Sequence, residues 1–338
     1  MLESRWPPRA ARLGKARRAS SRRREHRARP LKPTSFIMYC RDVNALAPLI
    51  LLIFLTLLAG CARNPKTAIP GGAGRQRLVS LAPSVTETLF ALGAGGETVG
   101  VSQYDDYPPA VRSLPRVGSF LTPNIEAIAA LRPTLVIGLS TSSDLREIRA
   151  LNAMGIATLM ADDGSVAAIE RSTILVGERI GRGAAARALV AALRGHLEAV
   201  ARRLRSTPRR KVLMVVGHQP MVAVGRGTFL DELLTLADAA NIADASNQAW
   251  PRLSLEYVIA TRPDVILDGQ MGSDPSTPGR FWSRYPTIPA VQSHRVFGYP
   301  EDPTLHPGPR IGLTLDLLAR RIHPEALAQP GFEDAARD

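Results

Sequence analysis

The sequence has only two cysteines, Cys40 and Cys61, and it lacks the short motifs of several enzyme classes. It contains no Walker A pattern, so we do not expect the chain to hydrolyse a nucleotide. Gly93 and Gly95 belong to a glycine-rich stretch, but Thr98 stands where a dinucleotide-binding fingerprint needs its third glycine. No Gly-x-Ser-x-Gly turn marks a hydrolase nucleophile. These absences favour binding over covalent chemistry.

Histidine pairs at metal-ligand spacing are missing too. The histidines of the folded part are scattered, at His196, His218, His294, His306 and His323. A receptor for a bare zinc or manganese ion is therefore not expected, and no metal site is predicted. His218 ends a predicted strand near the expected ligand site, but no other motif accompanies it, and we interpret it as a structural residue.

The net charge of +13 is concentrated at the beginning of the chain. Residues 1–37 carry twelve Lys or Arg and two Glu, a net charge of +10, whereas the chain from Cys61 onward has a net charge of only +3. The most basic stretch, SRRREHRARPLK, has no interleaved aromatic residues and is not expected to fold alone. A nucleic-acid-binding tail is one interpretation. We favour the other, a basic extension upstream of a start at Met38, with no nucleic-acid partner.

Residues 38–60 have the pattern of an export signal, with one Arg followed by an apolar run from Ala45 to Gly60. The run is short for a transmembrane helix, which needs about 20 apolar residues. It ends in Leu58-Ala59-Gly60-Cys61, which resembles the bacterial lipoprotein signal, where the peptide is cleaved before a cysteine that is then lipidated. We therefore expect an extracytoplasmic protein, anchored to a membrane by lipid on Cys61.

Cleavage of this signal would also remove Cys40, so no disulfide is expected in the exported protein. Residues 61–76 are rich in Pro and Gly and are predicted to form a flexible tether. The folded part is therefore expected to begin at Arg77.

Short β-branched runs alternate with helical patterns after the tether, which predicts parallel sheets covered by helices. The predicted strands form two sets, at residues 77–82, 98–102, 134–139 and 157–161, and at residues 211–217, 264–269 and 294–299. Between the sets, apolar residues recur at helical spacing at Val190, Leu193, Leu197, Val200 and Leu204.

The chain is thus predicted to be an α/β protein with two Rossmann-like lobes bridged by one long, rigid helix. The first lobe is expected at residues 77–165 and the second at 209–325, followed by a tail at 326–338. A helical region at 166–208 contains the bridging helix, 183–206. Ligands of such folds bind beyond the carboxyl ends of the strands, so we expect the site between the lobes.

One sequence pattern occurs twice, 130 residues apart: NIEAIAALRPTLVIG begins at Asn124, and SLEYVIATRPDVILDG begins at Ser254. Asn124 and Ser254 are predicted to cap helices, and Glu126 and Glu256 follow in the first turn. Each glutamate alone could simply complement its helix dipole. On matching elements of two lobes, the two are interpreted as a matched pair of negative contact points.

Several stretches resemble one known family, the extracytoplasmic substrate-binding proteins of ABC importers for cobalamin and iron chelates. The resemblance covers residues 77–325 and is carried by RLVSLAPSVTETLFALG, VGVSQYDDYPP, NIEAIAALRPTLVI, WPRLSLEYVIATRPDVI and GPRI. It implies the class III fold, in which a stiff helix forms the backbone between the lobes. It also implies a monomeric binding protein without enzymatic activity or cofactor, which serves a permease dimer with its ATPase subunits.

The resemblance further implies a role for individual residues. In this family one glutamate on each lobe docks onto arginines of the two permease subunits, and Glu126 and Glu256 fall at those positions. The implied ligand is cobalamin or a related corrinoid. The residues implied to contact it are Pro83, Ser84, Tyr104, Phe120, Trp250, Asp302 and His306. Ser84 is also predicted to cap a helix, with Glu87 at capping-box spacing.

Two positions depart from the pattern of the cobalamin-binding relatives. His306 replaces a ligand-contacting Arg, and Leu139 replaces a Trp, which thins the aromatic surroundings of the ligand. A haem or ferric-siderophore receptor of the same family therefore stays an alternative, and a tetrapyrrole metal chelatase is a more distant one. His306 could ligate a metal or form a hydrogen bond, Arg310 could bind a ligand carboxylate or form a structural ion pair, and Phe120 could pack in the core.

Overall fold

The computed structural model describes residues 75–142, 145–269 and 277–327. All of them belong to one compact unit, Gly72–Asp338. The basic extension, the export signal with Cys40 and Cys61, most of the tether and the end of the tail lie outside the described residues. Within the described ranges, no helix has both the length and the apolar character needed to cross a membrane.

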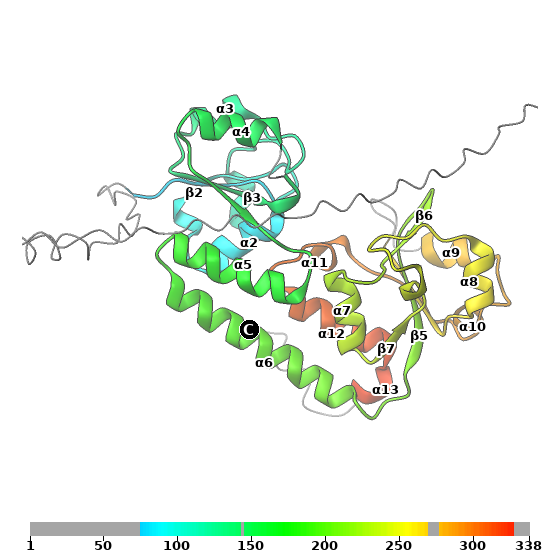
Figure 1. Ribbon diagram of the computed structural model, residues 1–338. Coiled ribbons are helices and arrows are strands. Elements are labelled where there is room, and N and C mark those ends of the chain that lie inside the picture. Colours follow the sequence, from blue (N-terminus) through cyan, green and yellow to red (C-terminus); the bar gives the residue numbers. More distant parts are fainter. Residues whose placement is uncertain (1–74, 143–144, 270–276, 328–338) are drawn as a thin grey trace, which may run out of the picture. The chain divides into compact units, whose positions relative to one another are not determined.

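The first lobe is built on a parallel four-stranded sheet in the order β2-β1-β3-β4 (Figure 1). Its strands are β1 (Leu78–Ser80), β2 (Thr98–Gly100), β3 (Leu135–Leu139) and β4 (Thr158–Ala161). Its helices are α2 (Pro83–Ala91), α3 (Ile125–Ala130), α4 (Arg146–Ala153) and α5 (Val166–Arg179), with 3-10 turns at Gly95–Glu97, Pro109–Ser113 and Ser140–Ser142. Every residue of β1 and β3 is buried, as expected for apolar runs in a sheet covered on both faces.

The second lobe is built on a sheet in the order β6-β5-β8-β9, with β7 also paired to β5. Its strands are β5 (Arg210–His218), β6 (Met221–Ala223), β7 (Ala239–Asn241), β8 (Val265–Asp268) and β9 (Val296–Gly298). All of these pairs are parallel except that of β6 with β5. Its helical elements are α7 (Phe229–Leu236), a 3-10 turn at Asp244–Ser246, α8 (Leu255–Thr261), α9 (Thr277–Trp282), α10 (Pro289–Gln292), α11 (Glu301–Thr304), α12 (Ile311–Ile322) and α13 (Pro324–Leu327).

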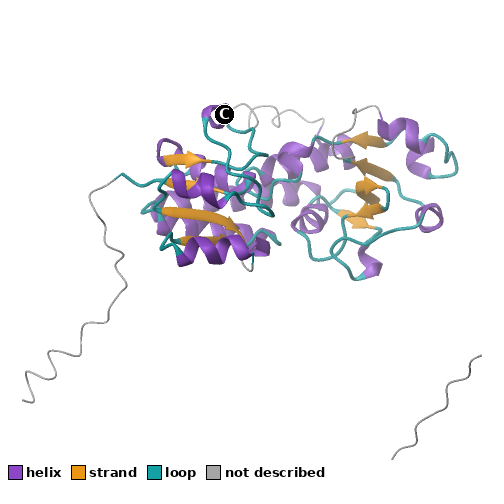
Figure 2. Ribbon diagram, turned by 90° about the horizontal axis from the view of Figure 1, so that it is seen from above, coloured by secondary structure: helices purple, strands orange, loops and turns teal. Residues whose placement is uncertain are grey.

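The long helix α6 (Gly183–Leu204) supplies buried residues to the cores of both sheets. It packs against α5 of the first lobe and against α7 and α12 of the second. Ala186, near its beginning, belongs to the core of the first sheet. The later apolar positions belong to the core of the second sheet: Leu193, Leu197, Val200 and Leu204. Figure 2 shows the strands of each sheet layered between helices.

All seven predicted strands are present, but β6 and β7 were not predicted. β6 directly follows the Gln219-Pro220 turn, and a proline inside an apolar run argues against a strand. β7 has the sequence Ala-Ala-Asn, which lacks the β-branched and aromatic residues that mark strands. Both are short strands at the margin of the sheet, where pairing with β5 outweighs weak local preference.

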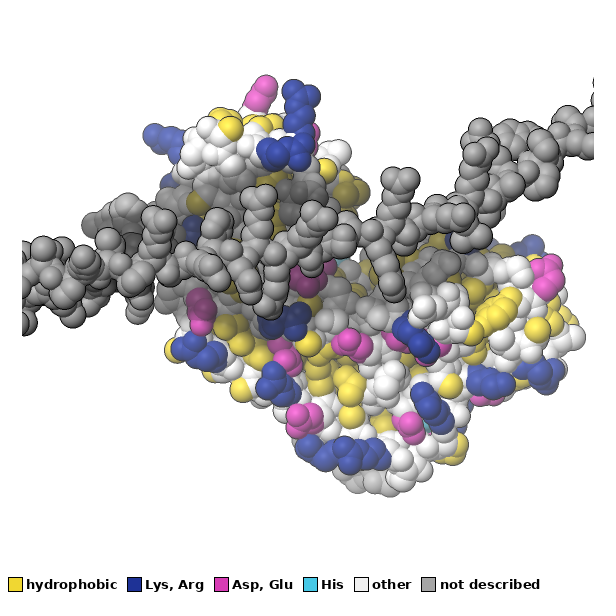
Figure 3. All heavy atoms as spheres, viewed as in Figure 1, with side chains coloured by type: hydrophobic (Ala, Val, Ile, Leu, Met, Phe, Trp, Pro, Cys, Tyr) yellow, Lys and Arg dark blue, Asp and Glu magenta, His cyan; other side chains and the backbone are white. Residues whose placement is uncertain are grey.

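Charges of both signs are interspersed on the face of the molecule that Figure 3 shows. Arg187, Arg194 and Arg202 lie on the outer side of α6 and are each about 60% exposed. All three contact a glutamate, so this face does not carry the continuous basic surface typical of nucleic-acid-binding proteins.

Candidate functional site

The two copies of the repeated sequence form matching helices, α3 and α8. In α3, Oδ1 of Asn124 accepts a hydrogen bond from the backbone N–H three residues on, at 3.0 Å. In α8, Oγ of Ser254 accepts the equivalent hydrogen bond, at 3.2 Å. Both predicted caps are therefore present. They place Glu126 and Glu256 in the first turn of each helix, where the helix dipole stabilises a carboxylate.

The two copies also have the same pattern of exposure from the cap to the arginine that ends the helix. In both, the cap, the glutamate and the arginine are exposed, and one aliphatic residue is buried. Arg132 and Arg262 both have positive φ, 46° and 52°, which ends each helix at the same point. Neither Glu126 nor Glu256 forms a salt bridge within the described part of the chain. Hydrogen bonds from its own backbone N–H and from Ser254 lower the pKa of Glu256.

The segment after β1 places Pro83 and Ser84 at the start of α2. Ala82 is the N-cap, Pro83 is the first helical residue, and no side chain caps the helix. The prediction that Ser84 caps this helix is wrong, because proline is preorganised for the first helical position and moves the cap two residues earlier. Ser84 is instead buried, and its carbonyl accepts a hydrogen bond from Oγ1 of Thr88 at 2.7 Å.

Two of the three predicted aromatic contacts present large exposed surfaces, since Tyr104 is 56% and Trp250 48% exposed. The segment that carries Trp250 is held close to the second sheet. The N–H of Gly225 donates to the carbonyl just before Trp250, at 2.9 Å. A Cβ at Gly225 would lie 2.1 Å from the carbonyl oxygen of Gln248, so this approach requires glycine. Phe120, by contrast, is half-buried and packs against the core of the first sheet.

The side chains of Glu87, Asp302 and His306 meet around Arg310, the residue that precedes α12. Its Nε donates to Oε2 of Glu87 at 2.8 Å, and one Nη donates to Oε1 at 2.5 Å. The other Nη donates to Oδ2 of Asp302 at 3.3 Å. Nδ1 of His306 lies 3.1 Å from Asp302 and 3.3 Å from Glu87. We call Glu87, Asp302, His306 and Arg310 the Arg310 cluster. It joins α2 of the first lobe to the segment before α12, and Arg310 forms ion pairs with Glu87 and Asp302.

Burial lowers the pKa of His306, but the hydrogen bond and charge of Glu87 and the charge of Asp302 outweigh it, so the pKa is raised overall. Burial likewise opposes the charge of Arg310, and its pKa is nevertheless raised by the hydrogen bonds that it donates to Glu87 and Asp302. The guanidinium also lies over the ring of Tyr107, 3.9 Å from the centroid, in a cation–π contact. The Arg310 cluster therefore favours the protonated form of His306.

Glu87, Asp302 and His306 are also the described residues whose donor atoms come close enough to hold a metal ion, within 4.8 Å of one another. Spacing along the chain did not indicate this group, because Glu87 lies more than 200 residues before the other two. The guanidinium of Arg310 already contacts both carboxylates. A divalent cation would have to displace this buried positive charge.

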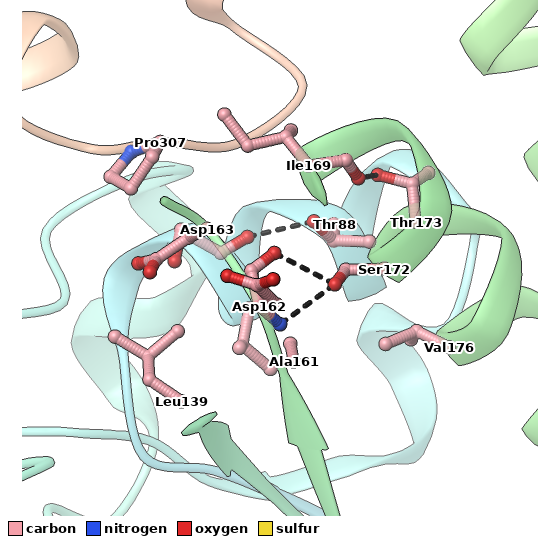
Figure 4. Close-up of a pocket in the computed structure, with 12 residues that line it drawn as sticks. Thr88, Leu139, Ala161, Asp162, Asp163, Ile169, Ser172, Thr173, Val176 and Pro307 are labelled. Carbon is pink, nitrogen blue, oxygen red and sulfur yellow. Dashed lines mark hydrogen bonds between the residues drawn. The ribbon is translucent and has the colours of Figure 1, made fainter. Parts of the chain in front are cut away.

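A small pocket lies at the carboxyl ends of β3 and β4, beside the start of α2 (Figure 4). Ser84, Leu139 and Asp163 line it from the first lobe, and Pro307 closes it from the segment before α12. Its volume, about 20 Å³, is enough for a water molecule. Burial, and repulsion by Asp162, raise the pKa of Asp163 to about 6. Ser84 is the predicted ligand-binding residue that lines this pocket.

Comparison with known proteins agrees with this arrangement of two sheets and one long helix. The sequence profile of the periplasmic binding protein family matches residues 78–303. The chain belongs to this family. Among its relatives is the uncharacterized ABC transporter substrate-binding lipoprotein YvrC of Bacillus subtilis, 30% identical over 262 residues, which are 75% of this chain and 82% of YvrC. The vitamin B12-binding protein of Yersinia pestis is 29% identical over 248 residues, 73% of this chain and 86% of that protein.

A solved structure extends the likeness to three dimensions. The periplasmic heme-binding protein RhuT from Roseiflexus sp. RS-1, in its apo form, superposes with a TM-score of 0.68 at 29% identity and covers 75% of this chain and 100% of RhuT. The predicted fold is thereby confirmed as that of a two-lobed periplasmic binding protein.

Membership of the periplasmic binding protein family establishes the general function. The protein is the extracytoplasmic substrate-binding component of an ABC importer, with a permease as partner and a small molecule as ligand. Members of this family bind their substrates and do not convert them, so the metal-chelatase alternative is set aside.

Sequence reasoning missed four residues that lie near the predicted site. Glu87 was considered only for a capping box, and its pairing with Arg310 spans 223 residues. Tyr107 lies three residues after Tyr104 in the same motif, and its stacking on Arg310 has no local signal. The Asp162-Asp163 pair after β4 could have been noticed, because acidic residues at the carboxyl end of a strand face the edge where ligands bind.

We expect stability to depend on pH through His306. Because the folded state raises the pKa of His306 above its usual value, its contribution is fully present below about pH 6.5 and is lost as the pH rises through the raised value. In urea unfolding, the wild type should lose more stability between pH 6 and pH 8 than His306→Gln. Equal losses in the two proteins would contradict this assignment, since His323 and Asp163 titrate in both.

Proposed function

We propose that the protein is a lipid-anchored receptor that captures cobalamin or a related corrinoid between its lobes. The observation that supports this ligand class is the pair of exposed aromatic side chains, Tyr104 of the first lobe and Trp250 of the second. Flat aromatic rings can stack on the large apolar faces of a corrin or a porphyrin. The 29% identity to a vitamin B12-binding protein supports the corrinoid.

In this proposal the remaining predicted residues complete the site. Pro83, Ser84 and Phe120 contact the ligand from the first lobe, and Asp302 and His306 contact its polar groups from the second. The pocket beside Ser84 holds about 20 Å³, whereas sites for drug-sized ligands occupy about 300 to 1,000 Å³. That pocket alone is therefore too small to enclose a macrocycle.

The two glutamates dock the loaded receptor onto its permease. Glu126 and Glu256 are exposed, lie at equivalent points of two matching helices, and form no salt bridge with another described residue. A permease made of two subunits presents the same basic surface twice, which two equivalent carboxylates fit. Such charge pairs set orientation and association rate more than affinity.

A haem or ferric-siderophore ligand is the second candidate, and one observation favours it. The Arg310 cluster raises the pKa of His306, and a cationic side chain suits ligand carboxylates such as those of haem. The likeness to the heme-binding protein RhuT points the same way.

Removing the exposed aromatic surface of the second lobe tests the proposed site. We expect Trp250→Ala to weaken corrinoid binding about tenfold, since an aromatic contact contributes about 0.5 to 1.5 kcal/mol beyond buried area. Calorimetric titration would measure the dissociation constants. Leu313→Ala, which shortens another exposed apolar side chain on α12, is the matched control and should bind like the wild type. Equal affinity of the wild type and the Trp250 variant would remove this residue from the site.

The lipid anchor has its own test. Cys61→Ser should release the protein from membranes or leave the signal uncleaved, because the thiol is the proposed site of lipidation. Fractionation of cells followed by immunoblotting would show the shift from the membrane to the soluble fraction, or a larger precursor. A processed variant that still fractionates with membranes would refute the lipoprotein assignment.

A further inference from the structure

The segment between β2 and the 3-10 turn at Pro109–Ser113 reverses the usual distribution of aromatic and charged side chains. Tyr104 is 56% and Tyr107 43% exposed, whereas Asp105, which lies between them, is only 3% exposed. Aspartate is almost never fully buried unless it is paired, and aromatic side chains are ordinarily buried more deeply. The chain here turns a carboxylate inward and two rings outward, so we looked for what the carboxylate contacts.

The carboxylate of Asp105 contacts the hydroxyl of Ser102, which is itself fully buried. Oγ of Ser102 donates a hydrogen bond to Oδ2 of Asp105. The same Oγ accepts a hydrogen bond from the backbone N–H of Tyr104, at 3.3 Å. A backbone N–H only donates and an ionised carboxylate only accepts, so the single hydroxyl proton of Ser102 must point to Asp105. Asp105 thereby fixes the orientation of the hydroxyl that holds the backbone of Tyr104.

The backbone of this segment is held at the same two residues. The N–H of Asp105 donates to the carbonyl of Ser102 at 3.3 Å. One Nη of Arg116 donates to the carbonyl of Ser102 at 2.9 Å and to the carbonyl of Asp105 at 2.6 Å. Arg116 stands four residues before Phe120, another predicted ligand contact. The segment that carries Tyr104 is therefore fixed to the segment that carries Phe120.

A carboxylate at this position is costly to the fold. Burial raises the pKa of Asp105, although hydrogen bonds from Ser102 and Thr86 and the charge of Arg116 act to lower it. Oδ1 of Asp105 nevertheless has no hydrogen bond of ordinary geometry with a described residue. Incompletely paired buried groups are expected where function requires them. The functional feature next to Asp105 is the exposed ring of Tyr104.

We propose that Asp105 is a positioning residue, which acts through Ser102 to hold the ring of Tyr104 outward for stacking on a tetrapyrrole. This inference rests on the proposed function, because it assigns Asp105 a role in presenting a ligand contact. Preorganisation of this kind raises affinity, since a side chain that is fixed before binding loses less conformational freedom on binding. Asp105 itself does not touch the ligand, because its side chain is buried.

A double-mutant cycle tests this role. Calorimetry would measure the dissociation constants of cyanocobalamin and of haemin for the wild type, Tyr104→Ala, Asp105→Ala and the double variant. We expect each single variant to bind about tenfold more weakly than the wild type. The double variant should bind as Tyr104→Ala does, because Asp105 has no ring left to position. Asp105→Asn keeps an acceptor oxygen for Ser102 and should bind nearly as tightly as the wild type.

Asp316→Ala is the matched control. Asp316 is also buried, burial also raises its pKa, and its Oδ1 lies 3.0 Å from Nε2 of His196 on α6. Its removal should lower the free energy of unfolding and leave both dissociation constants unchanged. If circular dichroism shows that Asp105→Ala does not fold, Ser102→Ala takes its place in the same cycle, with the same expected result.

The outcomes separate this inference from the proposed function. Suppose that the wild type binds one of the two compounds, but that Asp105→Ala binds it equally well or weakens binding by the same factor with and without the ring of Tyr104. The positioning role is then refuted, and the receptor assignment stands. If the wild type binds neither compound, both the tetrapyrrole ligand and the role of Asp105 are refuted.

Discussion

Replacing both Glu126 and Glu256 with alanine is expected to abolish ligand uptake by cells and to leave ligand affinity unchanged. Both carboxylates are exposed at the first turns of α3 and α8, and neither forms a salt bridge with another described residue. Their removal therefore costs only the local hydrogen bonds at the start of α8. The variant would lack both of the charged residues that orient the protein on the permease. Uptake of radiolabelled ligand and calorimetry on the purified variant measure the two quantities separately.

The matched control removes two other exposed glutamates, Glu178 and Glu198, whose side chains are 57% and 60% exposed. This double variant has the same net charge as the Glu126/Glu256 variant but keeps Glu126 and Glu256, and we expect normal uptake. Two results would contradict the docking role: normal uptake by the Glu126/Glu256 variant, or a loss of ligand affinity in that variant.

Breaking the Arg310 cluster is expected to have the largest effect on stability. Glu87→Ala leaves the guanidinium of Arg310 with a single carboxylate in a largely buried position, and Glu87 itself is only 1% exposed. Removal of one partner from a buried ion pair costs about 3 to 5 kcal/mol. Urea unfolding, followed by circular dichroism, would measure the change in the free energy of unfolding.

An exposed ion pair provides the comparison. Arg187 and Glu178 lie 3.3 Å apart with side chains that are 60% and 57% exposed. Since exposed pairs contribute about 0 to 1 kcal/mol, Arg187→Ala should change stability by no more than that. If Glu87→Ala were equally mild, the Arg310 cluster would not be a principal contact between α2 and the segment before α12.

The repetitive parts of the fold could be predicted because their signals are local. The strands β1, β3, β5 and β8 are continuous apolar runs, which only a doubly covered sheet accommodates. The apolar positions of α6 follow one face of a helix. The caps at Asn124 and Ser254 were predictable because an Asn or Ser side chain bonds to a backbone N–H only three residues away.

The chemistry of the site could be predicted only in part, because it depends on contacts between distant segments. Asp302 and His306 were named as ligand contacts, but nothing in the sequence pairs Glu87 with Arg310. The predicted cap at Ser84 failed because Pro83 took the first helical position. His218 was interpreted as a structural residue, and its partner could not be predicted, because Nε2 of His218 lies 2.7 Å from Oδ2 of Asp268, which is 50 residues away in the chain.

The measurement that tests the central claim most directly is a calorimetric titration of the purified protein with cyanocobalamin, dicyanocobinamide and haemin, each separately. Capture of a corrinoid predicts tight one-to-one binding of cyanocobalamin, of dicyanocobinamide or of both, without binding of haemin, and comparison of the two corrinoids shows whether the nucleotide loop is recognised. Binding of haemin alone would contradict the proposal that the ligand is a corrinoid, and it would identify the protein as the receptor of a haem importer. No binding of any of the three would contradict a tetrapyrrole ligand and direct the search to ferric siderophores.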